Sequence, residues 1–142
     1  MRQCTICMPL LFLIAVLPYV AGYCIYNNHT DDTYIWIRQI KGAGSTFERR
    51  FKRERLHRNE KACCPYTVSD CQVNRDRDAL VVFAMRQKFP QADGEFFEIN
   101  VPAGGSIVFA GNYYNPTIHA YDPSGEPFKF EFLYNPNDRK YQ

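Results

Sequence analysis

Residues 48–71 read ERRFKRERLHRNEKACCPYTVSDC, and this stretch holds both the densest positive charge and three of the six cysteines of the chain. Acidic residues outnumber basic ones over the rest of the chain after residue 22, so positive charge is concentrated here. Such a cluster attracts nucleic acid, anionic lipid or acidic polysaccharide, or serves as a nuclear localisation signal. The alternative interpretation is a solvated face that keeps the chain soluble. The basic residues are Arg49, Arg50, Lys52, Arg53, Arg55 and Arg58.

The N-terminus has the pattern of a secretory signal peptide. Arg2 precedes an uncharged apolar run at residues 8–20, and the small residues Ala21 and Gly22 follow it. The run is shorter than the roughly 20 apolar residues that a membrane span requires. We therefore predict a signal peptide at residues 1–22 and a single secreted domain at residues 23–142, with no transmembrane span.

Removal of residues 1–22 leaves four cysteines, Cys24, Cys63, Cys64 and Cys71, in a chain directed to an oxidising compartment. A bridge between the adjacent Cys63 and Cys64 would be strained, which leaves two pairings. Either Cys24 pairs with Cys63 and Cys64 with Cys71, or Cys24 pairs with Cys64 and Cys63 with Cys71. A zinc site is disfavoured because adjacent cysteines lack the usual ligand spacing. We expect no metal and no cofactor.

Short apolar or alternating runs separated by turn signals predict an all-β fold. Residues 23–27 and 33–40 read as two strands joined by a polar turn, and strands are also expected at 79–86, 95–101, 106–110, 118–121 and 127–133. In the last of these, Phe128, Phe130 and Phe132 alternate with charged residues, as in a strand with one face in the core. This spacing predicts an antiparallel β-sandwich of the Greek-key or jelly-roll kind, stapled by disulfides.

The basic stretch itself is ambiguous. Ser45 and Glu48 fit a helix capping box, with Phe47 and Phe51 one turn apart, so a short helix at 46–56 is one prediction. A strand is the other. Residues 56–63 have Asn59 at their centre like a hairpin turn, and an all-β context favours extended structure.

Two further features suggest surface roles. Residues 111–117 hold Tyr113, Tyr114 and Asn115 in a loop, where tyrosine rings suit sugar stacking or a protein contact. The alternative is a folded turn whose tyrosines cover the end of the core. Asn28 begins the N-glycosylation sequon Asn-His-Thr.

No catalytic motif is apparent, and we expect a binding protein, not an enzyme. The histidines are scattered and the cysteines are expected to be oxidised. A small secreted hydrolase would need paired carboxylates, which only the fold could bring together. The candidates are Asp93, Glu95, Glu98, Asp122, Glu126 and Glu131.

Residues 74–78 alternate acids and arginines, a pattern similar to a calcium-binding loop. Ala79 and Met85 stand where such a loop needs glycine and glutamate, so these acids are expected to pair internally or face solvent.

A signal peptide, a mature chain of about 120 residues and the motif CCPYTVSDC at 63–71 together resemble the small secreted proteins of filamentous and symbiotic fungi. Many of these act as effectors in a host. The resemblance implies a secreted binding protein acting on a host or cell-surface protein, and a nuclear address if it enters host cells. It implies wall polysaccharide or a membrane surface as partner if the protein stays outside. The alternative function is an extracellular carbohydrate- or surface-binding module using Tyr113, Tyr114 and Trp36. Sequence-specific nucleic-acid readout is not expected.

Overall fold

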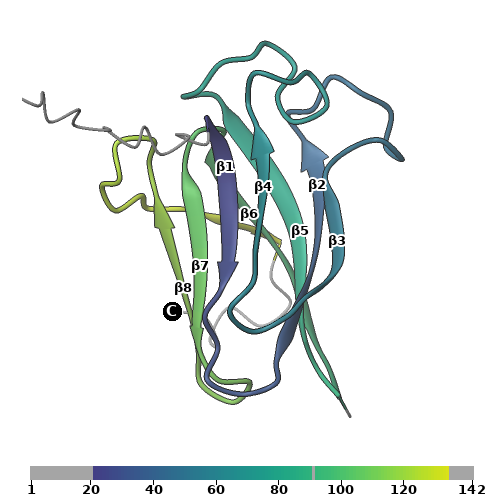
Figure 1. The fold of residues 1–142 in the computed structure, drawn as a ribbon, viewed down its shortest axis with the longest axis vertical. Helices are drawn as coiled ribbons and strands as arrows, with labels where there is room; N and C mark the ends of the chain where they lie inside the picture. The colour runs from purple at the N-terminus through teal and green to yellow at the C-terminus, as the bar shows by residue number, and fades with distance from the viewer. Residues whose placement is uncertain (1–20, 91, 135–142) are drawn as a thin grey trace, which may run out of the picture.

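The computed structural model describes residues 21–90 and 92–134, which form two packed β-sheets (Figure 1). The four-stranded sheet has the order β4 (Lys61–Pro65), β1 (Gly22–Asn27), β7 (Ser106–Gly111) and β8 (Pro116–Tyr121). The five-stranded sheet has the order β3 (Lys52–Leu56), β2 (Tyr34–Lys41), β5 (Leu80–Phe89), β6 (Ala92–Pro102) and β9 (Phe132–Tyr134). The prediction of an all-β sandwich is confirmed. All but residues 21 and 22 of the predicted signal peptide lie outside the described residues.

Side chains alternate between the core and the surface along the central strands. On β2, Ile35 and Ile37 are fully buried, whereas Tyr34, Trp36 and Arg38 lie half-buried on the outer face. The same period of two places Phe83, Met85, Phe97 and Ile99 of the neighbouring strands in the core. The four-stranded sheet contributes Tyr23, Ile25, Ile107 and Phe109 from the other side. The apolar period therefore determines which face of each sheet is buried.

One pair of strands departs from the predicted antiparallel arrangement. β1 lies between β4, with which it is antiparallel, and β7, with which it is parallel. The remaining pairs are antiparallel. Parallel strands need a long crossover connection. Here the chain provides one, because it crosses to the five-stranded sheet and returns between β1 and β7.

The predicted helix at 46–56 is wrong, and the strand alternative is confirmed for its second half. Residues 47–49 form a turn, in which the backbone N–H of Arg49 donates to the carbonyl of Thr46 at 3.1 Å, and β3 follows. Phe51 packs edge-on against Tyr23 with ring centroids 5.3 Å apart, whereas Phe47 is exposed. Pairing with β2 and burial of Phe51 and Leu56 outweigh the local capping signal.

The turns at 28–33 and 57–60 join strands of different sheets instead of forming hairpins. β1 is followed by β2 across the sandwich, and edge strand β3 is followed by edge strand β4. Asn59 takes up a left-handed conformation with φ of 64°, as expected of an asparagine at a sharp turn, and its N–H donates to the carbonyl of Asn27 at 2.7 Å. The prediction of extended structure around Asn59 is confirmed, but the hairpin is not.

The predicted strand at 127–133 is only partly formed. Regular pairing is confined to β9, while Pro127 makes an isolated bridge to Tyr121. The alternation nevertheless holds, because Phe128, Phe130 and Phe132 pack against the core while the charged residues between them are exposed. The path of this segment is therefore determined by contact of its phenylalanines with the core, not by hydrogen bonding to a neighbouring strand.

The disulfides follow the first of the two predicted pairings, Cys24–Cys63 and Cys64–Cys71. Cys24 lies opposite Cys63 in the register of β1 and β4, which places the two Cα atoms 4.1 Å apart. The second bridge closes the loop after β4 onto the buried Cys71. Two disulfides are typical of proteins from oxidising compartments, including the extracellular space. Within residues 21–90 and 92–134, no helix is long and apolar enough to cross a membrane.

Candidate functional site: a cationic groove at the edge of the sandwich

The basic segment is spread along the molecule and does not form one compact patch. Its first two arginines lie in the loop before β3, its next three cations lie on β3, and Arg58 lies in the turn that follows. Figure 1 shows that this loop and this turn lie at opposite ends of the sandwich. The six charges therefore cannot act as a single contact surface.

The arginines at the loop end are engaged within the protein. The guanidinium of Arg50 donates to the carbonyls of Ile40 and Ser45. The side chain of Arg49 lies 3.9 Å from the Asp70 carboxylate. The contacts of Arg50 tie the loop before β3 to the body of the protein, which indicates a structural role for Arg50, whereas the Arg49 side chain is 74% exposed.

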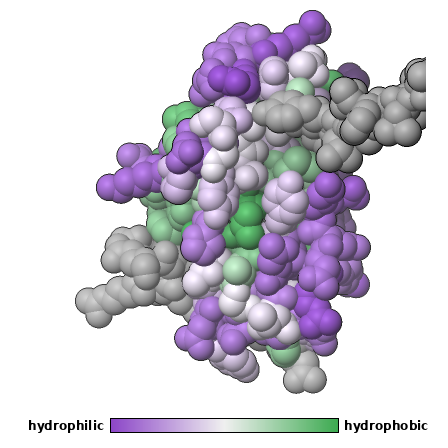
Figure 2. Space-filling model, turned by 60° about the vertical axis from the view of Figure 1, so that its left-hand side comes forward, coloured by the Kyte–Doolittle hydropathy of each residue, from purple (hydrophilic) through white to green (hydrophobic). Residues whose placement is uncertain are grey.

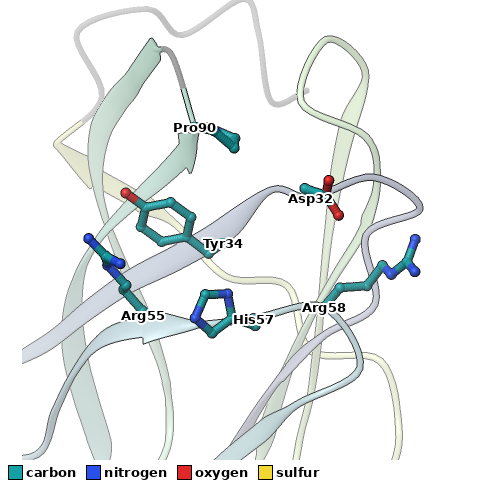
Figure 3. A pocket seen from close by; sticks show the side chains of 6 residues that line it. All are labelled: Asp32, Tyr34, Arg55, His57, Arg58 and Pro90. Carbon is teal, nitrogen blue, oxygen red and sulfur yellow. The ribbon is translucent and has the colours of Figure 1, made fainter.

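Two adjoining hollows at the other end form the candidate site, and we call them together the cationic groove. The first hollow, shown in Figure 3, has a volume of about 500 Å³ and is lined by Asp32, Tyr34, Arg55, His57, Arg58 and Pro90. The second has a volume of about 330 Å³ and is lined by Arg53, Arg55, Leu56, His57, Glu60 and Lys61. Because Arg55 and His57 line both hollows, the groove is continuous around the edge of the sandwich.

Edge strand β3 and the turn after it position the cations of the groove. Leu56 points into the core opposite Ile35, which anchors the end of β3. The neighbouring Arg55 faces outward, with its guanidinium 5.6 Å from the centroid of the Tyr34 ring. Arg58 donates from its guanidinium to the carbonyl of Thr30 at 3.1 Å. In Figure 3 the side chains of Arg55 and Arg58 point to opposite sides of His57.

The groove carries an excess of positive charge, although two acidic residues also line it. Arg53, Arg55, Arg58 and Lys61 are cationic and exposed, whereas Asp32 and Glu60 are acidic. The Glu60 carboxylate accepts the backbone N–H of His57 at 2.8 Å, so it also holds the turn. A row of exposed cations along an edge strand also discourages pairing with other chains. The arrangement suits reversible contact with an anion in the presence of solvent.

The predicted ligand loop lies at the same end of the molecule. The hydroxyl of Thr30 donates to the carbonyl of Gly111, and the backbone N–H of Tyr113 donates to the Asp31 carboxylate at 2.9 Å. Burial raises the pKa of the Asp31 carboxyl, but hydrogen bonds from Thr33 and from the Tyr113 backbone outweigh it, so the pKa lies below its ordinary value. Loop 28–33, which carries Asp32 and accepts from Arg58, therefore connects the groove to the tyrosine loop.

The two tyrosines of this loop have different surroundings. The Tyr113 ring packs against Phe89 with centroids 5.5 Å apart, whereas Tyr114 is 76% exposed. Asn112 caps the turn by accepting the backbone N–H groups of Tyr114 and Asn115. Tyr113 thus fits the prediction of a ring covering the end of the core, and Tyr114 is the ring presented to solvent.

Trp36 is not part of that loop surface. It lies on the outer face of the five-stranded sheet and lines a hollow of about 210 Å³ with Arg86, Lys88 and Phe96. Its ring centroid is 6.4 Å from that of Phe96. No residue of the tyrosine loop is among the described residues that line this hollow, and joint use of Trp36, Tyr113 and Tyr114 stays a prediction.

Several groove residues could not be identified from the sequence. Asp32, Tyr34, His57, Lys61 and Pro90 come from three separate stretches of the chain, at 32–34, 57–61 and 90, that meet only in the fold. Outward alternation on β2 is a signal that could have identified Tyr34 as a surface residue. Nothing local indicates that Pro90 approaches it.

An apolar groove lies on another side of the protein. It runs beside edge strand β8 and is lined by Ile118, His119, Ala120, Tyr121, Pro127, Phe128 and Phe130. On the side that Figure 2 turns toward the reader, hydrophobic surface lies in a hollow bordered by hydrophilic residues. This groove lacks the cations of the first one.

Among the carboxylate candidates, Asp122 and Glu126 lie in one turn. The hydroxyl of Ser124 and the backbone N–H groups of Ser124 and Glu126 donate to the Asp122 carboxylate, which lowers the pKa of this group. Glu98 lies on β6, and the side chains of Asp93 and Glu95 lie outside the described part. Arg77 and Asp78 form an ion pair at 3.2 Å, which confirms the predicted internal pairing at 74–78. Among described residues, no group of three or more His, Cys, Asp or Glu side chains is placed to hold a metal.

The sequon residue Asn28 is exposed at the same end of the molecule as the groove. Its backbone N–H donates to the carbonyl of Phe109 at 2.8 Å, so the position of the side chain is set by β7. Glycosylation at Asn28 stays a prediction.

Comparisons with known proteins supply no relative: no family model, no curated protein and no solved structure matches this chain.

Proposed function

We propose that this chain is a secreted, effector-like binding protein that contacts an anionic partner at a cell surface through the cationic groove. The observation that carries the proposal is the placement of Arg53, Arg55, Arg58 and Lys61 around two adjoining open hollows. The two disulfides support an extracellular setting.

The residue types in the groove support binding by contact. Arginine and tyrosine carry a large share of the energy at protein interfaces, and Arg55, Arg58 and Tyr34 line the same hollow here. Exposed cations also accelerate encounter with an acidic partner, in a manner that salt weakens. Either an acidic face of a host or cell-surface protein or an anionic polymer would meet this requirement.

Binding of labelled mature protein to recipient plant cells tests the proposal. The groove variant carries Arg53→Ser, Arg55→Ser and Arg58→Ser, and the matched control carries Arg49→Ser, Arg75→Ser and Lys129→Ser. Each variant removes three exposed cations. We expect the groove variant to lose about tenfold or more in affinity, and salt to weaken the wild type more than the groove variant. Equal losses in the two variants would show that only overall charge matters.

A nuclear localisation signal is the other proposed use of the basic segment. Its test must leave Arg50 unchanged, because Arg50 donates a hydrogen bond within the loop before β3. The fusion of residues 23–142 to a fluorescent protein must be too large to diffuse through nuclear pores. Lys52→Ser, Arg53→Ser and Arg55→Ser then form the informative variant. Nuclear accumulation of the wild type that this variant abolishes would favour the nuclear address over a surface partner.

The second candidate function is a carbohydrate- or surface-binding module, and the exposure of Tyr114 favours it. Saturable binding to a neutral glycan that Tyr114→Ala abolishes, with no effect of the groove variant, would support this candidate. Tyr113→Ala is a less informative change, because the Tyr113 ring also packs against Phe89.

A further inference from the structure

We propose that the partner of the cationic groove is an acidic polysaccharide that carries its charge as widely spaced carboxylates. This inference rests on the proposed function and names the class of partner. It depends on how the cations are spaced, on which acids stand among them and on the Tyr34 ring beside them.

The cations of the groove form a row and do not converge on one point. Arg53 and Arg55 are two residues apart on β3, or about 7 Å along the strand. Arg58 follows beyond the end of the strand, and in Figure 3 it points away from Arg55. A single phosphate or carboxylate could meet only one of these groups, whereas a linear chain with charges at intervals could meet several.

The acids in the groove disfavour a densely charged chain. Along the axis of a nucleic-acid duplex each strand carries a phosphate about every 3.4 Å, so some of the duplex phosphates would come close to Asp32 or Glu60. Like charges at close range disfavour such a complex. A chain with one carboxylate per sugar can place its charges at the arginines and its hydroxyl groups at the acids, which accept hydrogen bonds from them.

The aromatic residues of the first hollow also favour a polysaccharide over a single-stranded nucleic acid. Tyr34 supplies the one phenol ring that lines the first hollow, with the His57 ring centroid 5.9 Å away and Pro90 lining the same hollow (Figure 3). Binding of single-stranded nucleic acid without sequence preference uses successive aromatic rings on which successive bases stack. One half-buried ring beside a proline instead offers an apolar wall for one sugar face. The first hollow, at about 500 Å³, lies in the size range of small-ligand sites.

Calorimetric titration with four probes tests the inference. The probes are oligogalacturonate, the same oligomer fully methyl-esterified, poly-glutamate of matched charge, and a single-stranded oligonucleotide. We expect oligogalacturonate to bind, and the neutral ester, which has the same sugars without the charge, not to bind. Poly-glutamate and the oligonucleotide are expected to bind about tenfold or more weakly, because they lack the contacts of sugar with Tyr34 and the acids.

Three variants locate the site. Arg55→Ser and Tyr34→Ala are each expected to weaken oligogalacturonate binding about tenfold or more, because each removes one side of the first hollow. Tyr34→Phe keeps the ring and is expected to keep the binding, which separates loss of the ring wall from loss of the fold. Arg49→Ser, at the other end of the molecule, is the charge-matched control for Arg55→Ser.

The outcomes distinguish this inference from the proposed function. Equal or tighter binding of poly-glutamate or the oligonucleotide would overturn the polysaccharide and leave an anionic partner in place. Absence of binding to oligogalacturonate, with salt-dependent cell binding through the groove retained, would also overturn only the polysaccharide. If the groove variants bind both oligogalacturonate and cells as the wild type does, both proposals are wrong.

Discussion

At the scale of single residues, the buried imidazole of His29 makes the stability of the fold depend on pH. Its Nδ1 lies 2.7 Å from Oδ1 of Asn27, whose own amide donates to the carbonyls of Thr33 and Leu56. Because the amide orientation makes Oδ1 the acceptor, Nδ1 carries the proton in the neutral ring. Nε2 has no hydrogen-bond partner among the residues that the structure describes. A second proton would therefore enter a buried site without an acceptor.

Burial lowers the pKa of His29 in the folded protein, and the nearby Asp31 only partly opposes this effect. The unfolded chain then binds the proton more readily, so His29 favours the folded state fully above its ordinary pKa of about 6.5 and progressively less below it. We expect the free energy of unfolding, measured in urea, to fall between pH 7 and pH 5. The fall should be smaller in His29→Gln.

His119→Gln is the matched control, because His119 is exposed on β8. It should keep the pH dependence of the wild type. The same dependence in His29→Gln and the wild type would contradict the assignment to His29.

At the scale of elements, the two disulfides are expected to stabilise unequally. Cys24–Cys63 closes a loop with a sequence separation of 39 and joins β1 to β4, whereas Cys64–Cys71 closes one with a separation of 7. The chain-entropy model gives about 4 kcal/mol for the longer loop and about 2.5 kcal/mol for the shorter. Denaturant unfolding of Cys24→Ala/Cys63→Ala and of Cys64→Ala/Cys71→Ala measures the two contributions. A larger loss from the second pair would contradict the model.

The turn that carries Arg58 depends on Asn59. Its φ of 64° suits asparagine or glycine, and most other side chains are strained there. Asn59→Ala should lower the free energy of unfolding by about 1 kcal/mol, whereas Asn59→Gly should leave it nearly unchanged. Thermal unfolding of the two variants measures the difference, and equal losses would indicate that the side chain, not the backbone, is what matters.

At the scale of the whole molecule, a buried polar chain joins the two sheets. The Tyr23 hydroxyl on β1 donates to Gln39 Oε1 on β2 at 2.8 Å, and Gln39 Nε2 donates to the carbonyl of Cys71 at 2.7 Å. Burial raises the pKa of the Tyr23 phenol well above its ordinary value, so the hydroxyl stays a donor. The chain connects β1, β2 and the disulfide loop at one point.

Tyr23→Phe should lower the free energy of unfolding by about 1–3 kcal/mol, because Gln39 Oε1 would stay buried without its donor. Tyr26→Phe is the control on the same strand, since Tyr26 is half-buried. Calorimetric unfolding of both variants measures the difference. A loss in Tyr23→Phe no greater than in Tyr26→Phe would show that this hydrogen bond adds little.

Local sequence patterns determined which side chains are buried along several strands and how many disulfides form. Alternation along residues 34–40 separated Ile35 and Ile37 from Trp36, and two disulfides followed from four cysteines after a signal-like segment. The phenylalanines at 128, 130 and 132 reached the core even where the expected strand did not form, because burial depends on their spacing. These features follow from the side chains of neighbouring residues, which the sequence displays directly.

The tertiary structure alone decided which strands pair and what gathers at the edge of the sandwich. The pairing of Cys24 with Cys63 depends on the register of β1 and β4, and the strand at Lys52–Leu56 depends on pairing with β2. The groove needed Arg55 and Arg58 from the basic segment, Tyr34 from β2 and Pro90 from the turn after β5. Contacts between residues so far apart in the chain arise from the packing of two sheets, which no local pattern of residues encodes.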